Sequence, residues 1–145
     1  MKVNGTRKFS NVSSQQVFQA ILDPEVLKST IPGCNLVEYL DPNHIEANIT
    51  PPLPGLNRPY NAVIRIVKRQ DPSHLVLRVQ HKGKGGSIKA EAQISLAEEA
   101  DGTLLSYDAN ADLNGPISIV NNPIGQGFFK SSLNSFFAGV EKAMA

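Results

Sequence analysis

The chain has 145 residues and a formal net charge of +1, with 14 Lys and Arg against 13 Asp and Glu. A chain of this length can bury about two-thirds of its unfolded surface around one core, so we expect a single domain over residues 1–145. The balanced charge excludes the basic field that draws proteins onto nucleic acid, and no nucleic-acid partner is expected.

The N-terminus lacks the uninterrupted apolar core of a signal peptide, and no run of about 18 apolar residues follows it. Cys34 is the single cysteine, so it cannot form an internal disulfide, which fits a reducing compartment. We expect this thiol to be a small buried hydrophobe and not a nucleophile. The expected location is cytoplasmic, with peripheral contact at the inner face of the membrane as the alternative.

The front of the chain predicts one strand and two short helices. After a strand over residues 3–10, Ser13 and Gln16 have the spacing of a capping box and so predict a helix start. Pro24 suits the first turn of a second helix over Glu25–Ser29. The buried stripe of the first helix is expected to be Val17, Phe18, Ile21 and Leu22.

The middle of the chain changes to a period of two, which is typical of strands with one covered face. Five or six such runs are expected between Ile45 and Leu113, and Asp101-Gly102 offers a hairpin turn between the last two. With the first strand they predict a curved antiparallel sheet of six to seven strands.

The tail predicts a long amphipathic helix that begins at Asn122 and Pro123. Its apolar residues recur every three or four positions: Ile124, Phe128, Phe129, Leu133, Phe136, Phe137, Val140 and Met144. The order of elements predicts an α+β fold, in which the sheet wraps around this C-terminal helix.

Small residues stand on the covered face of the sheet, where a packed core would ordinarily hold Leu, Val or Phe. Either the tail helix approaches closely and fills the space, or a cavity for an apolar ligand lies between sheet and helix. We favour the cavity, because empty volume costs about 24 cal/mol per Å³ and is normally retained for use. The small residues are Ala62, Ala90, Ala92, Ala109 and Ala111.

The ligand contacts expected on this hypothesis come from the covered sheet face, the tail helix and two loops. A mouth is expected at residues 51–59 and 121–127. The full set of expected ligand-binding residues is Ile31, Leu53, Tyr60, Ala62, Leu77, Val79, Ala90, Ala92, Tyr107, Ala109, Ala111, Ile124, Phe128 and Leu133.

Catalytic groups, metals and cofactors are not expected at this cavity. Asp108, Asn110 and Asp112 alternate out of phase with the covered face and should point to solvent. The three histidines lie in turns or at a strand end, without the spacing of metal ligands. Arg7 and Tyr107 are the inward polar candidates, with local hydrogen bonding as their expected role.

Several segments resemble the CoxG family of carbon monoxide dehydrogenase subunits. They are LDPEVL at 22–27, IPGC at 31–34, HKGKGG at 81–86, TLLSYDA at 103–109 with Gly115, and Phe136-Phe137. That family belongs to the START-like (SRPBCC) helix-grip superfamily, so the resemblance implies a grip-shaped sheet, a long C-terminal helix and a hydrophobic guest between them.

The resemblance also implies a role beside a molybdenum carbon monoxide dehydrogenase or related hydroxylase, in membrane attachment and in handling its electron acceptor. An isoprenoid quinone is then the candidate ligand. Two alternatives stay open: an assembly or membrane-recruitment module without ligand carriage, and a small enzyme like the cyclases and hydratases of the superfamily. Many family members carry a C-terminal extension for membrane attachment, which is not seen here by Ala145, so stable anchoring is not expected.

Overall fold

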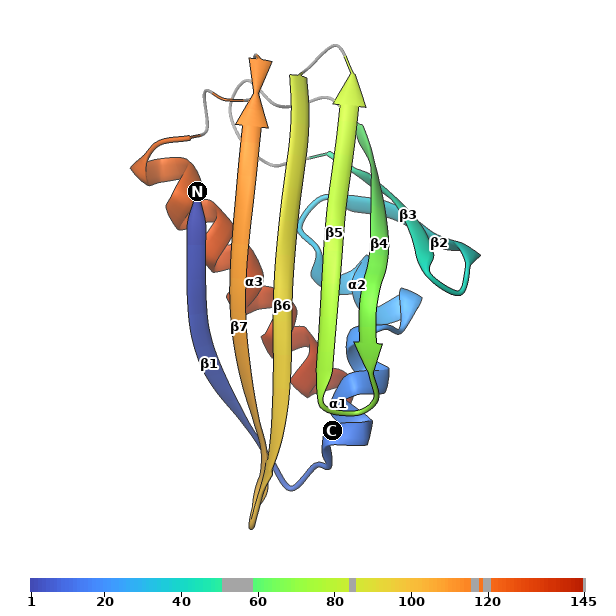
Figure 1. Cartoon of the computed structure of the whole chain (residues 1–145), viewed down its shortest axis with the longest axis vertical. Coiled ribbons are helices and arrows are strands. Elements are labelled where there is room, and N and C mark those ends of the chain that lie inside the picture. The colour runs from blue at the N-terminus through green and yellow to red at the C-terminus, as the bar shows by residue number, and fades with distance from the viewer. Residues whose placement is uncertain (51–58, 84–85, 116–117, 119–120, 145) are drawn as a thin grey trace.

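The computed structural model describes residues 1–50, 59–83, 86–115, 118 and 121–144. Its elements in chain order are β1 (Lys2–Ser10), α1 (Ser14–Ile21), α2 (Pro24–Thr30), β2 (Cys34–Asp41), β3 (His44–Ile49), β4 (Tyr60–Gln70), β5 (His74–Gly83), β6 (Gly86–Glu99), β7 (Gly102–Asn114) and α3 (Pro123–Ala143). The α+β class, the two short helices after the first strand and the long C-terminal helix are confirmed (Figure 1).

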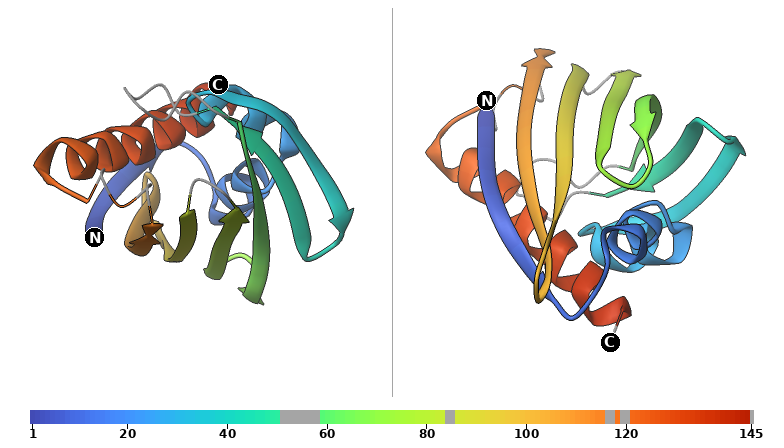
Figure 2. Two further views of the ribbon diagram at one scale, coloured as in Figure 1. Left: turned by 90° about the horizontal axis from the view of Figure 1, so that it is seen from above. Right: turned by 60° about the horizontal axis from the view of Figure 1, so that its bottom comes forward.

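The seven described strands form one antiparallel sheet in the order β1-β7-β6-β5-β4-β3-β2. Strands β2 to β7 pair with their neighbours in the chain, and β1 closes the order by pairing with β7. Figure 2 shows the sheet curling so that the helices lie on its concave side. The concave face therefore receives the inward side chains of every second strand position.

Each helix begins where the sequence predicts. Ser13 accepts a hydrogen bond from the backbone N–H of Gln16 at 3.2 Å and donates its own backbone N–H to that side chain at 2.9 Å, which is the expected capping box. Asp23 caps α2 through the N–H of Glu25 at 2.9 Å. Asn122 caps α3 through the N–H of Gly125 at 2.9 Å, with Pro123 as the first helical residue.

The core joins the C-terminal half of α3 to α1 and the lower sheet. Phe9, Phe18, Leu105 and Phe137 are all buried there. The first turn of α3 lies beyond edge strand β1 (Figures 1 and 2), so Ile124 is 80% exposed and does not join the buried stripe predicted for it.

Strand β2 is the element that the sequence did not predict. Register shifts near both of its ends break the alternation, and its outward side chains Leu36 and Leu40 are exposed although apolar. The inward residue Val37 lies opposite Ala47 of β3. Cys34 at the start of β2 is only half-buried, which corrects the expectation of a buried residue.

Candidate functional site

An apolar cavity of about 230 Å³ lies between the concave face of the sheet and α3. The sheet side consists of Ile64 on β4, Leu77 and Val79 on β5, Ala90, Glu91, Ala92 and Ile94 on β6, and Tyr107 and Ala109 on β7. The helix side consists of Leu27, Ile31 and Pro32 from α2 and the turn after it, and Phe129, Ser132, Leu133, Phe136 and Phe137 from α3.

The cavity exists because a strip of small side chains runs along the centre of the sheet. Ala92 lies opposite Ala109 of β7 on one side and Leu77 of β5 on the other, and Ala90 lies between Ala111 and Val79 in the same way. Helix α3 packs chiefly against α2, β1 and α1. It therefore crosses the alanine strip without descending onto it, and the space predicted from the alanines is present.

Eight of the fourteen expected ligand contacts line the cavity: Ile31, Leu77, Val79, Ala90, Ala92, Tyr107, Ala109 and Leu133. Leu53 lies outside the residues that the structure describes.

The structure places the other five elsewhere. Ala62 is buried against Ala47 of β3, and the ring of Tyr60 packs edge-on against His81 with centroids 4.9 Å apart. Ala111 borders a different hollow, because it lies one inward position closer to the strand end than Ala109. Ile124 and Phe128 lie on α3, where they do not border the cavity.

The position expected for Phe128 is held by its neighbour Phe129. One step along a helix turns the side chain by about 100°, so adjacent residues face different surroundings. Other lining residues missed by the sequence reasoning continue patterns that were visible in it. Ile94 extends the period of Ala90 and Ala92, and Phe136 and Phe137 belong to the predicted helical stripe.

Three described lining residues carry polar side-chain atoms. The hydroxyl of Ser132 donates to the carbonyl of Phe128 at 2.8 Å, within its own helix. The carboxylate of Glu91 accepts from Arg78 Nε at 3.2 Å. Tyr107 packs its ring against Phe137, with centroids 5.1 Å apart. The lining is otherwise apolar, which suits an apolar guest held by a small number of polar groups.

A second and more open hollow of about 900 Å³ lies at the ends of β4 to β7. It mixes apolar residues such as Ile88 with exposed polar residues such as Gln80, Lys89 and Asp112. Binding sites for small molecules are predominantly apolar and enclosed, so we take the cavity under α3 as the candidate site.

The titratable side chains expected to face solvent do so. Asp108, Asn110 and Asp112 are all exposed. His44 Nδ1 lies 2.7 Å from Asp41 Oδ2, and this hydrogen bond lowers the pKa of the Asp41 carboxyl. The Nε2 atom of His44 accepts from Arg65 Nε at 3.2 Å.

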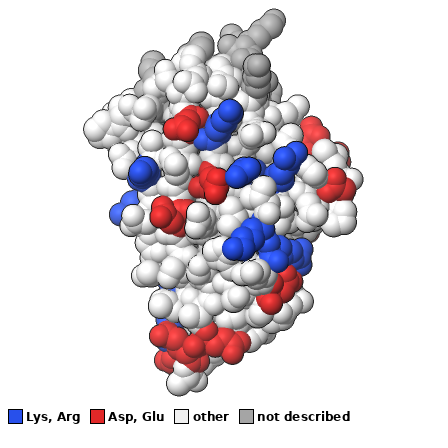
Figure 3. All heavy atoms as spheres, in the orientation of Figure 1, with Lys and Arg blue, Asp and Glu red and all other residues white. Residues whose placement is uncertain are grey.

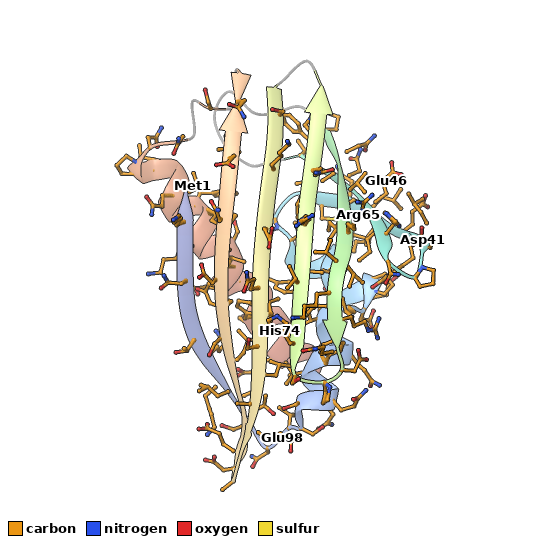
Figure 4. The ribbon with its side chains drawn as sticks, in the orientation of Figure 1. Met1, Asp41, Glu46, Arg65, His74 and Glu98 are labelled. Atoms are coloured by element: carbon orange, nitrogen blue, oxygen red, sulfur yellow. The ribbon has the colours of Figure 1, made fainter. Side chains whose placement is uncertain are left out.

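Figure 4 shows Asp41 at the tip of the β2–β3 hairpin and Arg65 on β4, on the opposite side of the sheet from α3. Within the described ranges no three His, Cys, Asp or Glu side chains gather closely enough to hold a metal ion.

None of the helices in the described part of the chain is both long enough and apolar enough to cross a membrane.

A curved seven-stranded antiparallel sheet, a long C-terminal helix in its concavity and an apolar cavity between them define a START-like helix-grip protein. The chain is similar to a START superfamily protein from Mycobacterium smegmatis, with a TM-score of 0.72 and 14% identity over 99% of this chain and 96% of that one. It is also similar to a conserved protein from Geobacillus kaustophilus, with a TM-score of 0.89 and 23% identity over 99% and 95% of the two chains.

The model of the CoxG family, the G-type subunits of carbon monoxide dehydrogenase, matches residues 10–145, and the chain belongs to that family. The family predicted from the sequence is thus confirmed. The comparison with curated proteins found no match.

Proposed function

We propose that this protein is a non-catalytic carrier that holds a hydrophobic molecule in the cavity under α3. An isoprenoid quinone is the candidate ligand, with other lipids as alternatives. The partner we propose is a molybdenum carbon monoxide dehydrogenase or a related hydroxylase, in keeping with the name of the CoxG family. The observation that supports the proposal most directly is the apolar cavity of about 230 Å³ over a floor of alanines.

The volume limits what the cavity holds in this conformation. An apolar cavity of roughly 150 Å³ is enough for a benzene ring, whereas sites for drug-sized molecules usually span about 300–1,000 Å³. A cavity of about 230 Å³ therefore accepts a ring or the end of a chain. A long prenyl tail would have to extend out of the cavity, or α3 would have to move away from the sheet.

Carriage between a membrane and an enzyme requires uptake that is easily reversed. An apolar chain gains about 0.8 kcal/mol per CH₂ on leaving water but almost nothing on leaving a bilayer, where the surroundings are already apolar. An apolar cavity consequently exchanges its guest with a membrane at little cost in free energy, while release into water is strongly disfavoured.

The side chains around the cavity favour binding over catalysis. General acid–base chemistry needs titratable groups within hydrogen-bond reach of the substrate. Of the described lining residues with ionisable side chains, Glu91 is engaged by Arg78, and Tyr107 lies in an aromatic contact with Phe137. Neither arrangement forms an acid–base pair.

Native mass spectrometry of the protein purified without detergent tests the proposal. We expect a second mass peak that exceeds the chain mass by that of a lipophile, and the same lipophile in an organic extract. A companion assay mixes the ligand-free protein with vesicles that contain an isoprenoid quinone and measures quinone in the protein fraction. An empty mass together with no uptake from vesicles would contradict carriage.

One observation favours the alternative of an assembly module without ligand carriage. The outer face of the sheet exposes apolar side chains near the β2 edge, namely Leu36, Leu40, Val63 and Val67. Exposed apolar side chains that gather on one face are typical of contact surfaces. If this alternative holds, Leu36→Ser with Leu40→Ser will abolish binding to the dehydrogenase in a protein that copurifies with no lipophile.

A further inference from the structure

The hydroxyl of Tyr107 is a buried polar group whose partner the described residues do not provide. Tyr107 borders the cavity and is only 7% exposed, and no described group forms a hydrogen bond with its hydroxyl. Tyrosine hydroxyls that are buried normally find a partner. The completely enclosed side-chain N and O atoms without partners in the described ranges are Arg7 Nε and Ser14 Oγ. The Tyr107 hydroxyl is not one of them, so it still adjoins open space.

The fold holds this hydroxyl in a fixed place. Tyr107 lies directly opposite Gly5 of β1, and a Cβ atom at Gly5 would lie 2.8 Å from the tyrosine oxygen. Glycine therefore makes room for the ring to lie across β1, while Phe137 of α3 packs against the same ring with centroids 5.1 Å apart. Contacts from two elements keep the ring in one orientation, so the hydroxyl is positioned before any ligand arrives.

The other polar groups of the lining already have partners. Ser132 donates to the backbone of Phe128 at 2.8 Å, and Glu91 accepts from Arg78 at 3.2 Å. Among the lining residues that the structure describes, Tyr107 is thus the side chain that remains available to a guest. A single polar group in an apolar site fixes the orientation of the ligand and its specificity.

We propose that the Tyr107 hydroxyl donates a hydrogen bond to an oxygen of the bound molecule, so that the cavity selects apolar molecules with a carbonyl or hydroxyl oxygen over hydrocarbons of the same shape. This inference rests on the proposed function and adds the residue that sets ligand class. Tyr107 acts here as a specificity-determining residue, and the oxygen of the ligand lies toward β1.

The test uses two probes of one shape, 2,3-dimethyl-1,4-naphthoquinone and 2,3-dimethylnaphthalene. The methyl groups occupy the ring positions at which the Cys34 thiol would otherwise add to a quinone. Binding of each probe is measured to the wild type and to Tyr107→Phe, which keeps the ring and removes the oxygen. Tyr60→Phe is the matched control, because Tyr60 is equally buried at 7% exposure but lies away from the cavity.

We expect Tyr107→Phe to weaken the naphthoquinone by about fivefold to tenfold, as the loss of one hydrogen bond implies, and to leave the hydrocarbon unchanged. Tyr60→Phe should change neither affinity. A second measurement follows the infrared carbonyl band of the bound quinone. The band should move to lower frequency in the wild type and return in Tyr107→Phe, a change that altered packing alone would not produce.

Equal losses of affinity for both probes, or none for either, would overturn this inference and leave the proposed carrier function standing. If the wild type binds neither probe, the proposed function fails and the inference fails with it.

Discussion

Ala92 of β6 lies directly opposite Ala109 of β7, and both side chains border the cavity beneath α3. Residues opposite each other in an antiparallel pair have Cβ atoms about 4.5–5.5 Å apart, so these two alanines form one continuous part of the floor. A larger side chain at either position would rise directly into the space proposed for the ligand.

Ala92→Phe and Ala109→Phe should each abolish quinone uptake while the fold survives. The new ring enters an existing cavity of about 230 Å³, and a space of roughly 150 Å³ already accepts benzene, so little repacking is needed. Uptake from quinone-containing vesicles and the thermal unfolding midpoint are measured together. Ala97→Phe on the exposed part of β6 is the control and should leave uptake unchanged. Normal uptake in both cavity variants would argue strongly against the site.

The alternation of residues was sufficient to predict most of the sheet and the strip of alanines. It assigned Ala90, Ala92 and Ala109 to the covered face, and their registers bring them together beneath α3. It could not tell where along the strip the helix stops covering the sheet. Ala111 continues the same period but lies beyond the cavity, because α3 crosses the strands obliquely (Figure 2).

The rotation of α3 about its axis was also beyond the sequence. Adjacent aromatic residues at 128–129 and 136–137 allow more than one face to be the buried one. Contacts with other elements decide between them, including the close approach of α3 to α2 at Gly139. Strand β2 escaped prediction for a related reason, since the register shifts near its ends interrupt the period of two.

The approach of α3 to α2 should make Gly139→Ala destabilising. A Cβ atom there would overlap the Thr30 Cγ2 methyl, and Thr30 cannot turn freely because its hydroxyl donates to the carbonyl of Val26 at 2.6 Å. The two helices must therefore separate, at a cost of about 1–3 kcal/mol in the free energy of unfolding. Urea denaturation measures the change.

Gly127→Ala is the matched control in the same helix, because a Cβ atom there meets nothing within 4 Å. It should stabilise the protein by about 0.5–1 kcal/mol, the usual gain from replacing glycine inside a helix. Thr30→Ser in the Gly139→Ala background removes the methyl and keeps the hydroxyl, so it should restore stability. If Gly139→Ala is as harmless as Gly127→Ala, the helices are not in close contact.

Lys8 should stabilise the fold only within a window of pH. Its ammonium donates to Glu99 at 2.6 Å and to Asp101 at 2.7 Å, and so ties β1 to the β6–β7 turn, where Figure 3 shows acidic side chains gathered. The hydrogen bond from Lys8 lowers the pKa of Asp101, and the same hydrogen bonds raise the pKa of Lys8.

The lowered pKa of Asp101 contributes stability above the unfolded value of about 3.9, and this contribution is lost as the pH falls through the lower folded value. The raised pKa of Lys8 contributes below its unfolded value of about 10.4 and is lost as the pH rises through the folded one. Lys8→Gln should therefore unfold at lower urea than the wild type at pH 7 but at nearly the same urea at pH 2.5. Lys2→Gln on the same strand is the control, and a Lys8→Gln deficit that persists undiminished at pH 2.5 would contradict the linkage.

The Cys34 thiol should react slowly in the folded protein, which matters for a protein proposed to carry quinones, because thiolates add to quinone rings. Burial raises the pKa of Cys34, while the positive charge of Lys28 offsets part of that rise. At pH 7.5 the side chain is therefore mostly the unreactive thiol, since the thiolate is the nucleophile. Alkylation by iodoacetamide should be slower in the folded chain than in the same chain unfolded in urea. Lys28→Gln should slow it further, because the offsetting charge is removed, and an alkylation rate equal in the folded and unfolded chains would show that burial does not protect the sulfur.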